Sequence, residues 1–291
     1  MARVSISDGA AAGIVLAGGR SSRMGEPKAA LEWHGSTLLH RTAALLGRTV
    51  DGPVVVVRAP GQELPALPAG VEVVEDPVEG LGPMQGIATG LATVAARAPI
   101  AFVCSTDMPF LHPAFVQRVL RVLADLDPAV DVVLPVARGF PQPLAAGYRT
   151  ALAELVAKLV ADGQLRPAML FKQCRVARPD DAELLTDAPL ARLDPDLDSL
   201  VNVNAPEDYA AARRRPAPQI TVQRYGALAS GGHHGPQAVR AGTLAAAAAA
   251  TGLVLDRHVV AALNGDQISR DPALPLVAGD VVAFLSADAG G

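Results

Sequence analysis

Cysteine and long apolar segments are both scarce in this chain of 291 residues. Its two cysteines, Cys104 and Cys174, have neither a C-x-x-C spacing nor a nearby histidine, which excludes a disulfide framework and a four-cysteine zinc site. The longest apolar stretch near the start, residues 10–17, is far shorter than the roughly 20 residues that span a bilayer. It also leads directly into glycines, unlike a signal peptide. We therefore expect a cytoplasmic protein with no membrane segment.

Charge is also modest. The net charge is −4, charged residues make up 19% of the chain and hydrophobic residues 50%, which excludes disorder and nucleic-acid binding driven by bulk positive charge. Only three of the 25 basic residues are lysines, namely Lys28, Lys158 and Lys172. Because lysine is so rare in this chain, a lysine that lies within a motif is notable. The length favours two domains.

Short runs of apolar, often β-branched residues alternate with helix-like segments along the first 160 residues. Such runs, without strict polar alternation, suit strands buried on both faces. Alternating strands and helices predict an α/β domain with a mostly parallel sheet and helices on both faces. The expected strands are residues 13–17, 54–57, 71–74, 100–104 and 130–136, and the expected helices are 37–46, 85–96, 113–126 and 150–161.

The alternation ends at residues 213–218, where three arginines are followed by two prolines within three residues. Such a segment cannot continue a helix and indicates a linker; a solvated helix end followed by a loop would mark the same boundary. We therefore expect domains at residues 1–212 and 219–291. The second has a small α+β pattern: strands at 220–224, 259–263 and 281–285, a glycine- and histidine-rich loop at 230–235, and an alanine-rich helix at 243–250.

A glycine-rich loop, L-A-G-G-R-S-S-R-M-G-E-P-K at residues 16–28, follows the first expected strand. Glycines beyond the carboxyl end of such a strand allow backbone N–H groups to approach phosphate oxygens closely. Arg23 and Lys28 supply the positive charge that a triphosphate needs. The spacing is neither G-x-G-x-x-G nor that of the P-loop, which disfavours dinucleotide oxidoreductases and P-loop ATPases.

This loop resembles the signature L-x-G-G-x-x-x-R-M-G-x-x-K of nucleotidyltransferases that modify molybdopterin. Further segments of that family follow in the same order: Asp76 with G-P-M-Q-G at 82–86, S-T-D-M-P-F at 105–110, P-Q-P-L at 141–144 and N-V-N-A-P-E-D at 202–208. Structural interpretations stay open beside them. Gly82 and Pro83 could start a helix, Asp107 could cap a loop, and Asn204 with Glu207 forms a capping-box pattern.

The chain thus resembles the MobA-like molybdenum cofactor guanylyltransferases over about residues 13–213. The resemblance implies a Rossmann-like fold and transfer of GMP from GTP to molybdopterin, with Mg²⁺ held by Asp107. It implies that Lys28, Arg23 and Asp107 are catalytic, the two basic residues stabilising the leaving pyrophosphate. The binding residues that it implies for the nucleotide and the pterin are Leu16, Ala17, Gly18, Gly19, Lys28, Asp76, Asp107, Asn202 and Asn204.

Alternatives remain at this point. The pair Gly18-Gly19 and the Asn202-x-Asn204 pattern favour guanine, whereas Pro27 is familiar from cytidylyltransferases. A molybdopterin cytidylyltransferase would share the mechanism, and a sugar-nucleotide pyrophosphorylase would share the style of the loop. From another class, the chain could be mainly a sulfur carrier with a nucleotide-binding scaffold.

The second domain resembles the ubiquitin-like (β-grasp) sulfur carriers of molybdopterin and thiazole synthesis. Residues 263–267 (L-N-G-D-Q) and 276–284 (L-V-A-G-D-V-V-A-F) resemble their approximate A-V-N-G and L-x-D-G-D segments, and the chain ends at Gly290-Gly291. The resemblance implies that a partner adenylates the carboxylate of Gly291, which then becomes a thiocarboxylate. The implied partners are the molybdopterin synthase large subunit and an activating adenylyltransferase. We expect the chain to bind neither nucleic acid nor membranes. His233-His234 indicates a solvated loop rather than a metal site.

Overall fold

The computed structural model describes residues 10–18, 27–229, 235–265 and 267–286, and these divide into two compact units. The larger unit contains the described residues up to 31 and residues 38–206. The smaller one contains residues 32–37 and the described residues from 207 onward. None of the helices among the described residues is long and apolar enough to cross a membrane.

A seven-stranded sheet forms the centre of the larger unit, with strand order β11-β7-β10-β6-β1-β4-β5. The pairs β6–β1, β1–β4, β4–β5 and β11–β7 are parallel, and β10 is antiparallel to both of its neighbours. The expectation of a mostly parallel sheet is therefore confirmed. The strands are β1 (Ala11–Leu16), β4 (Val54–Arg58), β5 (Val71–Glu75), β6 (Ile100–Ser105), β7 (Val132–Val133), β10 (Ala145–Arg149) and β11 (Val176–Ala177).

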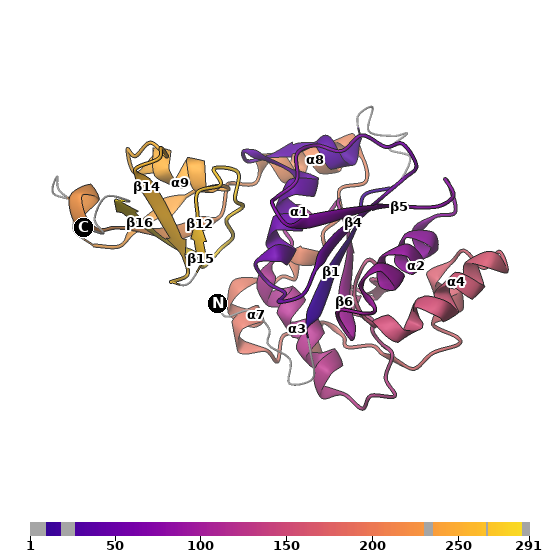
Figure 1. Cartoon of the computed structure of the whole chain (residues 1–291). Coiled ribbons are helices and arrows are strands. Elements are labelled where there is room, and N and C mark those ends of the chain that lie inside the picture. Colours follow the sequence, from indigo (N-terminus) through magenta and orange to yellow (C-terminus); the bar gives the residue numbers. More distant parts are fainter. Residues whose placement is uncertain (1–9, 19–26, 230–234, 266, 287–291) are drawn as a thin grey trace. The chain divides into compact units, whose positions relative to one another are not determined.

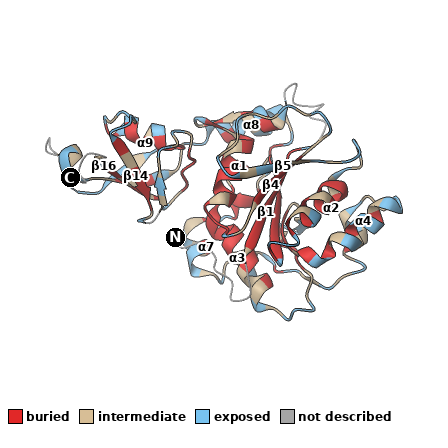
Figure 2. Ribbon diagram, in the orientation of Figure 1, coloured by how far each residue is buried: buried red, intermediate tan, exposed pale blue. Residues whose placement is uncertain are grey.

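Helices cover both faces of this sheet, with α1 and α3 on one side and α2 and α4 on the other (Figure 1). All six residues of β1 are buried, as expected for a parallel strand covered on both faces. Figure 2 shows the same concentration of buried residues in the central strands and the inward faces of the helices. The helices are α1 (Leu38–Gly47), α2 (Pro83–Val94), α3 (Pro113–Asp125), α4 (Ala153–Ala161), α5 (Pro167–Leu170), α6 (Asp181–Leu184) and α7 (Ala188–Leu193), with 3-10 turns η1 (Lys28–Ala30), η2 (Thr150–Leu152) and η3 (Asp198–Leu200).

The expected strand at residues 130–136 was wrong in extent, because only β7 lies within the seven-stranded sheet. Pro135 has no N–H to donate to a neighbouring strand, and the chain turns there into a hairpin of β8 (Val136–Ala137) and β9 (Phe140–Pro141). Strand β10 was not expected at all, since its sequence A-A-G-Y-R is rich in residues of low strand propensity. Its position between β6 and β7 comes from packing.

The smaller unit contains a five-stranded mixed sheet with strand order β13-β12-β16-β14-β15, in which β12 and β16 are parallel. Helix α9 contributes Leu244, Ala247 and Ala248 to a core shared with Val222 and Phe284. The elements are β2 (Glu32–Trp33), β3 (Ser36–Thr37), α8 (Pro206–Arg214), β12 (Gln219–Arg224), η4 (Gly226–Ala229), β13 (Gln237–Arg240), α9 (Leu244–Ala250), β14 (Val259–Leu263), β15 (Gln267–Ser269) and β16 (Val281–Ser286). Strands β13 and β15 were not expected, and α8 includes the first two arginines of the expected linker.

Two motif residues of this unit have structural roles. Asn264, with φ of 54°, donates from Nδ2 to Asp280 Oδ1 over 2.9 Å and accepts from the Val281 backbone over 2.9 Å. The second oxygen of Asp280 accepts from the Val277 backbone, and Asp280 is buried. These bonds join the turn after β14 to the turn before β16.

A glycine in α2 supports a stability prediction. A Cβ at Gly90 would lie 2.5 Å from Ile14 Cγ2 on β1, so Gly90→Ala must push the helix away from the sheet. We expect overpacking to lower the free energy of unfolding by about 1–2 kcal/mol, although alanine is normally the better helix residue. Urea unfolding measures the change. Gly47→Ala in α1 is the control, because its Cβ would lie 4.0 Å from Val54 Cγ2; equal stability of the two variants would contradict the prediction.

Candidate functional site

The start of the glycine-rich loop is held at the carboxyl end of β1. The Ala17 backbone N–H donates to Val57 O over 2.8 Å, and the Gln62 side chain donates from Nε2 to Ala17 O over 3.0 Å. A Cβ at Gly18 would lie 3.2 Å from the Ala59 backbone nitrogen, so the approach of this loop to the segment after β4 favours glycine. Leu16 and Ala17 are buried. Gly19 and Arg23 lie outside the described residues.

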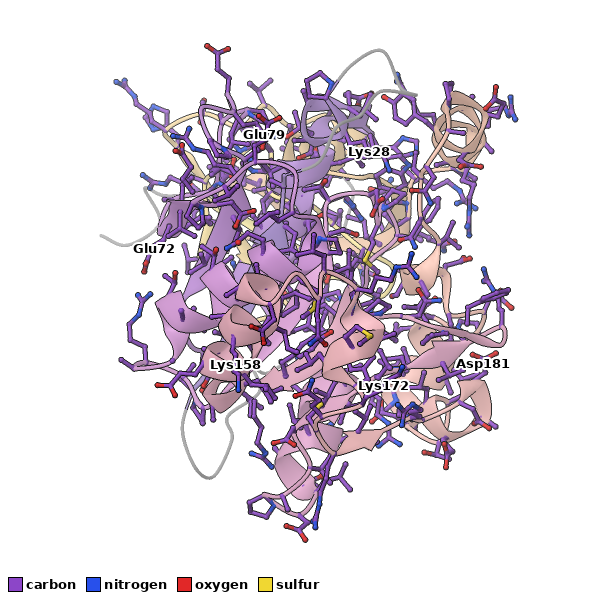
Figure 3. The ribbon with its side chains drawn as sticks, turned by 90° about the vertical axis from the view of Figure 1, so that its right-hand side faces the viewer. Lys28, Glu72, Glu79, Lys158, Lys172 and Asp181 are labelled. Carbon is purple, nitrogen blue, oxygen red and sulfur yellow. The ribbon has the colours of Figure 1, made fainter. Side chains whose placement is uncertain are left out.

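Lys28, Asp107 and Asn204 meet at the carboxyl edge of the sheet. The Lys28 ammonium donates to Asp107 Oδ2 and to Asn204 Oδ1, each over 2.9 Å. The side chains of Lys28 and Asp107 are 22% and 16% exposed, so the pair is only partly screened by water. Lys28 is labelled in the upper part of Figure 3. Three residues that the sequence motifs assigned to one site are therefore brought together from positions up to 176 residues apart.

The Asp107 loop is fixed from several sides. The Ser105 hydroxyl donates to Asp107 Oδ1, and the Val203 backbone N–H donates to Asp107 O over 2.8 Å. Arg41 of α1, only 2% exposed, donates from Nε to Pro109 O over 2.9 Å. The sequence analysis did not assign a role to Arg41 or Gln62, because each lies outside the recognised motifs. One carboxylate oxygen of Asp107 and the main chain of its loop are thus each held by neighbouring residues.

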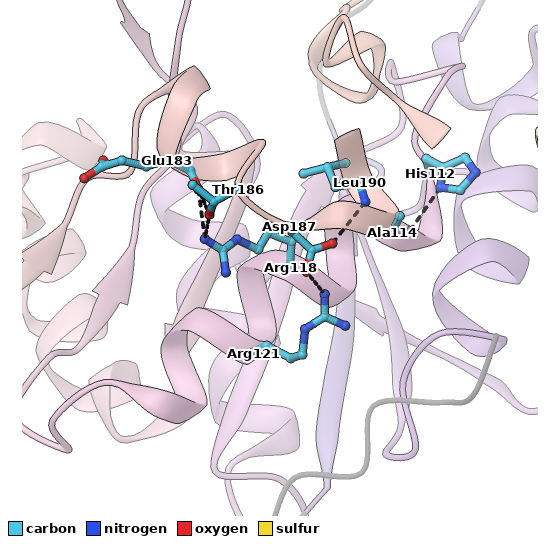
Figure 4. Close-up of polar contacts among 8 residues, drawn as sticks. All are labelled: His112, Ala114, Arg118, Arg121, Glu183, Thr186, Asp187 and Leu190. Carbon is cyan, nitrogen blue, oxygen red and sulfur yellow. Dashed lines mark hydrogen bonds and ion pairs between the residues drawn. The ribbon is translucent and has the colours of Figure 1, made fainter. Parts of the chain in front are cut away.

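The segment that carries Asn204 is anchored on α3. Arg118 of α3 donates to Glu183 O and to Thr186 Oγ1, and Arg121 pairs with Asp187 (Figure 4). Further along the chain, Ser199 Oγ accepts from the His112 backbone over 2.9 Å, at the residue before α3. Residues 202–204 follow directly from this anchored stretch.

The Asn204 amide oxygen accepts from Lys28, a residue far from it along the chain, and helix α8 begins two residues after Asn204, at Pro206. Asn202 is exposed. By contrast, Gly82 has φ of 74° and α2 starts at Pro83, so the helix-start interpretation of that pair is confirmed.

Asp76 lies beyond the carboxyl end of β5 and is bonded to Thr89 of α2, whose hydroxyl donates to Asp76 Oδ1 over 2.9 Å. The Thr89 hydroxyl in turn accepts from Gln85 Nε2 over 3.2 Å. Partial burial raises the pKa of the Asp76 carboxyl above its usual value, and the bond from Thr89 opposes part of that increase. Ionised Asp76 therefore stands in a setting that favours an added hydrogen-bond donor or cation.

Asp76→Asn tests whether this carboxylate is kept for binding rather than for stability. Because the pKa of Asp76 is raised in the folded state, the protonated carboxyl is favourable to folding at low pH. This contribution to the free energy of unfolding is lost as the pH rises through the folded-state pKa of Asp76. At pH 7 the variant should therefore unfold at the same or a higher temperature than the parent, and this difference should disappear below about pH 4. Its KM for the nucleotide should rise. A lower melting temperature with an unchanged KM would contradict the binding role.

The carboxylate of Asp107 fits a magnesium ion whose other ligands are mainly phosphate oxygens and water. The described residues contain no group of three or more His, Cys, Asp or Glu side chains that could hold a metal. Mg²⁺ bound to nucleotides is usually held by one or two carboxylates together with phosphates and water, and Asp107 supplies one such carboxylate.

Neither cysteine is suited to thiolate chemistry. Burial raises the pKa of the Cys104 thiol and raises that of Cys174 to about 11, so both thiols stay protonated at neutral pH.

Comparisons with known proteins identify the family. A sequence model of the "MobA-like NTP transferase domain" matches residues 13–177. A "Probable molybdenum cofactor guanylyltransferase" of Mycobacterium tuberculosis (strain H37Rv) is 43% identical over 162 residues, which cover 55% of this chain and 78% of the relative. The protein of the same name from Mycobacterium ulcerans is 40% identical over 179 residues, 60% of this chain and 86% of the relative.

The fold is also found among solved structures. Molybdopterin-guanine dinucleotide biosynthesis protein A from Archaeoglobus fulgidus superimposes with a TM-score of 0.52 at 21% identity, covering 69% of this chain and 96% of that one. The residues that the family model matches include both Lys28 and Asp107. Through residues 13–177, the chain belongs to the MobA-like NTP transferase domain family.

Proposed function

We propose that this nucleotidyltransferase transfers GMP from GTP to molybdopterin, giving molybdopterin guanine dinucleotide and pyrophosphate. The observation that carries the proposal is the meeting of Lys28 and Asp107 beside the start of the glycine-rich loop, at the sheet edge where α/β proteins bind ligands. The names of the mycobacterial relatives support the choice of guanine and of molybdopterin. A cytoplasmic location is part of the same proposal.

The residues would act mainly by positioning and by neutralising charge. Backbone N–H groups of Gly18 and Gly19 would donate to phosphate oxygens, while Lys28 and Arg23 would stabilise the charge that develops on the leaving pyrophosphate. Asp76 would hold the nucleotide. No general base is required, because the attacking phosphate of molybdopterin is ionised at neutral pH.

Asp107 would hold Mg²⁺ together with the nucleotide phosphates, and the ion would supply charge neutralisation there. The hydroxyl of Ser105 would hold the carboxylate, and the backbone N–H of Val203 would hold the main chain of Asp107. Asn202 and Asn204 were expected to face the pterin. We retain this for Asn202, which is exposed, while the bond between Asn204 and Lys28 favours a role for Asn204 on the phosphate side.

A pyrophosphate-release assay with ATP, GTP, CTP and UTP, each with and without molybdopterin, tests this proposal. The expected result is release with GTP alone and only when molybdopterin is present. Release with CTP instead would favour the cytidylyltransferase, and release that requires a sugar phosphate would favour a pyrophosphorylase. No release from any nucleotide would contradict a nucleotidyltransferase and leave the nucleotide-binding scaffold as the better reading.

For the smaller unit we propose a sulfur-carrier role. Its mixed sheet has two parallel central strands, β12 and β16, with α9 packed on one face, and β16 is the last described strand before Gly290-Gly291. These features support the resemblance to ubiquitin-like carriers; the two glycines themselves lie outside the described residues, as do His233 and His234. The partners would be an activating adenylyltransferase and the molybdopterin synthase large subunit.

Mass spectrometry of the intact protein tests the carrier role. Purified with an activating adenylyltransferase, ATP and a sulfur donor, the chain should gain the mass difference of a thiocarboxylate at Gly291. A variant that lacks Gly290 and Gly291 is the control and should remain unchanged. If the full chain is not converted under conditions that convert a known carrier, the role is contradicted.

A further inference from the structure

The Lys28 ammonium lies where a cation is expected to bind. It donates to Asp107 Oδ2 over 2.9 Å, and Asp107 Oδ1 accepts from Ser105, so both carboxylate oxygens have donors. Asn204 Oδ1 accepts from the same ammonium over 2.9 Å. One carboxylate and one amide oxygen are hard ligands of the kind that a divalent cation prefers.

A lysine and a metal ion compete for such an oxygen. Mg²⁺ binds a carboxylate oxygen at about 2.0–2.1 Å and brings a shell of further ligands, which leaves no room for an ammonium on that oxygen. Their like charges also repel, and the low exposure of both side chains weakens the screening. A metal ion and the Lys28 ammonium therefore compete for Asp107 Oδ2.

The backbone at Lys28 is fixed while its side chain can move. Ala29 and Leu31 are buried, and the turn η1 is closed by bonds from Ala30 N to Pro27 O and from Leu31 N to Lys28 O. The lysine side chain has four rotatable carbon–carbon bonds beyond this anchor, so its ammonium can change partner without refolding the loop.

We propose that Lys28 is an internal counter-cation that keeps Asp107 from binding metal until a nucleotide arrives. This inference rests on the proposed function for the identity of the nucleotide. The negatively charged triphosphate takes over the Lys28 ammonium, and Asp107 becomes available in the same event. Lys28 thus has two partners in turn, the carboxylate before binding and the phosphates after it, and metal enters with the nucleotide rather than alone.

Titration of the full-length protein with Mn²⁺ alone, followed by the electron paramagnetic resonance signal of free Mn²⁺, tests this proposal. Without nucleotide, Lys28→Met should bind Mn²⁺ about threefold or more tightly than the parent protein, in line with the loss of a partly exposed ion pair. The added affinity must vanish in the double variant Lys28→Met/Asp107→Asn.

Lys158→Met is the matched control. It removes the same charge and residue type from an exposed position on α4, well separated from Lys28 in Figure 3, and should bind Mn²⁺ like the parent. A threefold gain in both lysine variants would show a general charge effect and overturn the proposal, as would unchanged or weaker binding in Lys28→Met. The readout contains neither GTP nor molybdopterin, so its failure is distinct from failure of the pyrophosphate-release assay.

Discussion

Replacing Asp107 by asparagine is expected to lower the rate of nucleotidyl transfer by about 100-fold or more while leaving the fold intact. Asparagine has the same size, and its amide oxygen can still accept from Lys28 while its NH2 group donates to the Ser105 hydroxyl, so the loop after β6 should keep its shape. What is lost is the negative charge. Charge stabilisation of the phosphates is the main task of the protein in phosphoryl transfer, which is why the rate should suffer far more than stability.

The measurement is steady-state pyrophosphate release with GTP and molybdopterin over a range of Mg²⁺ concentrations, together with a thermal melt. Asp180→Asn is the matched control, since Asp180 is an exposed N-cap of α6 and asparagine caps helices equally well. The control should keep the activity and the melting temperature of the parent. If Asp107→Asn turns over like the parent, Asp107 is not the metal ligand and the proposed site is wrong.

The position of this site could be predicted from the sequence because parallel strands end at one edge of a sheet. The loop after β1 carries Lys28 and the loop after β6 carries Asp107, and the two strands are neighbours in the sheet. Their apolar sequences predicted buried strands with ligand-binding loops at the carboxyl ends, whereas the pairing of β1 with β6 is known only from the structure. The burial of β1 and β6 on both faces leaves the loops at their carboxyl ends as the places for polar chemistry.

The bonds within the site could not be predicted in the same way. The local pattern around Asn204 can indicate a helix cap, but it cannot predict a bond to Lys28, which lies 176 residues away. The buried Arg41 belongs to no motif, and only the packing of α1 against the loop after β6 shows that its guanidinium supports Pro109. Strand β10 was missed for a related reason: a Cβ at Gly147 would lie 3.1 Å from Val119 Cγ1, so close packing against α3 favours glycine there despite its low strand propensity.

Lys28→Met is expected to lower kcat by about 100-fold or more, comparable to the loss of one charge-stabilising donor from an active site. Methionine keeps a similar length and apolar stem, so the anchored turn η1 should form as before. Because both members of the Lys28–Asp107 pair are partly exposed, the free energy of unfolding should change by about 1 kcal/mol or less. Lys158→Met serves again as the control and should be unaffected in rate and stability.

The same substitution should therefore have opposite effects on two measurements. Without nucleotide, removing the Lys28 ammonium should make Asp107 a better metal ligand, whereas with GTP and molybdopterin the reaction should nearly stop. A residue needed only to hold the loop in shape would weaken both, because a displaced Asp107 would bind metal less well. Slow turnover together with weaker Mn²⁺ binding and a lower melting temperature would thus identify Lys28 as structural and contradict the catalytic role. Slow turnover with tighter Mn²⁺ binding is the result expected if Lys28 exchanges Asp107 for the phosphates.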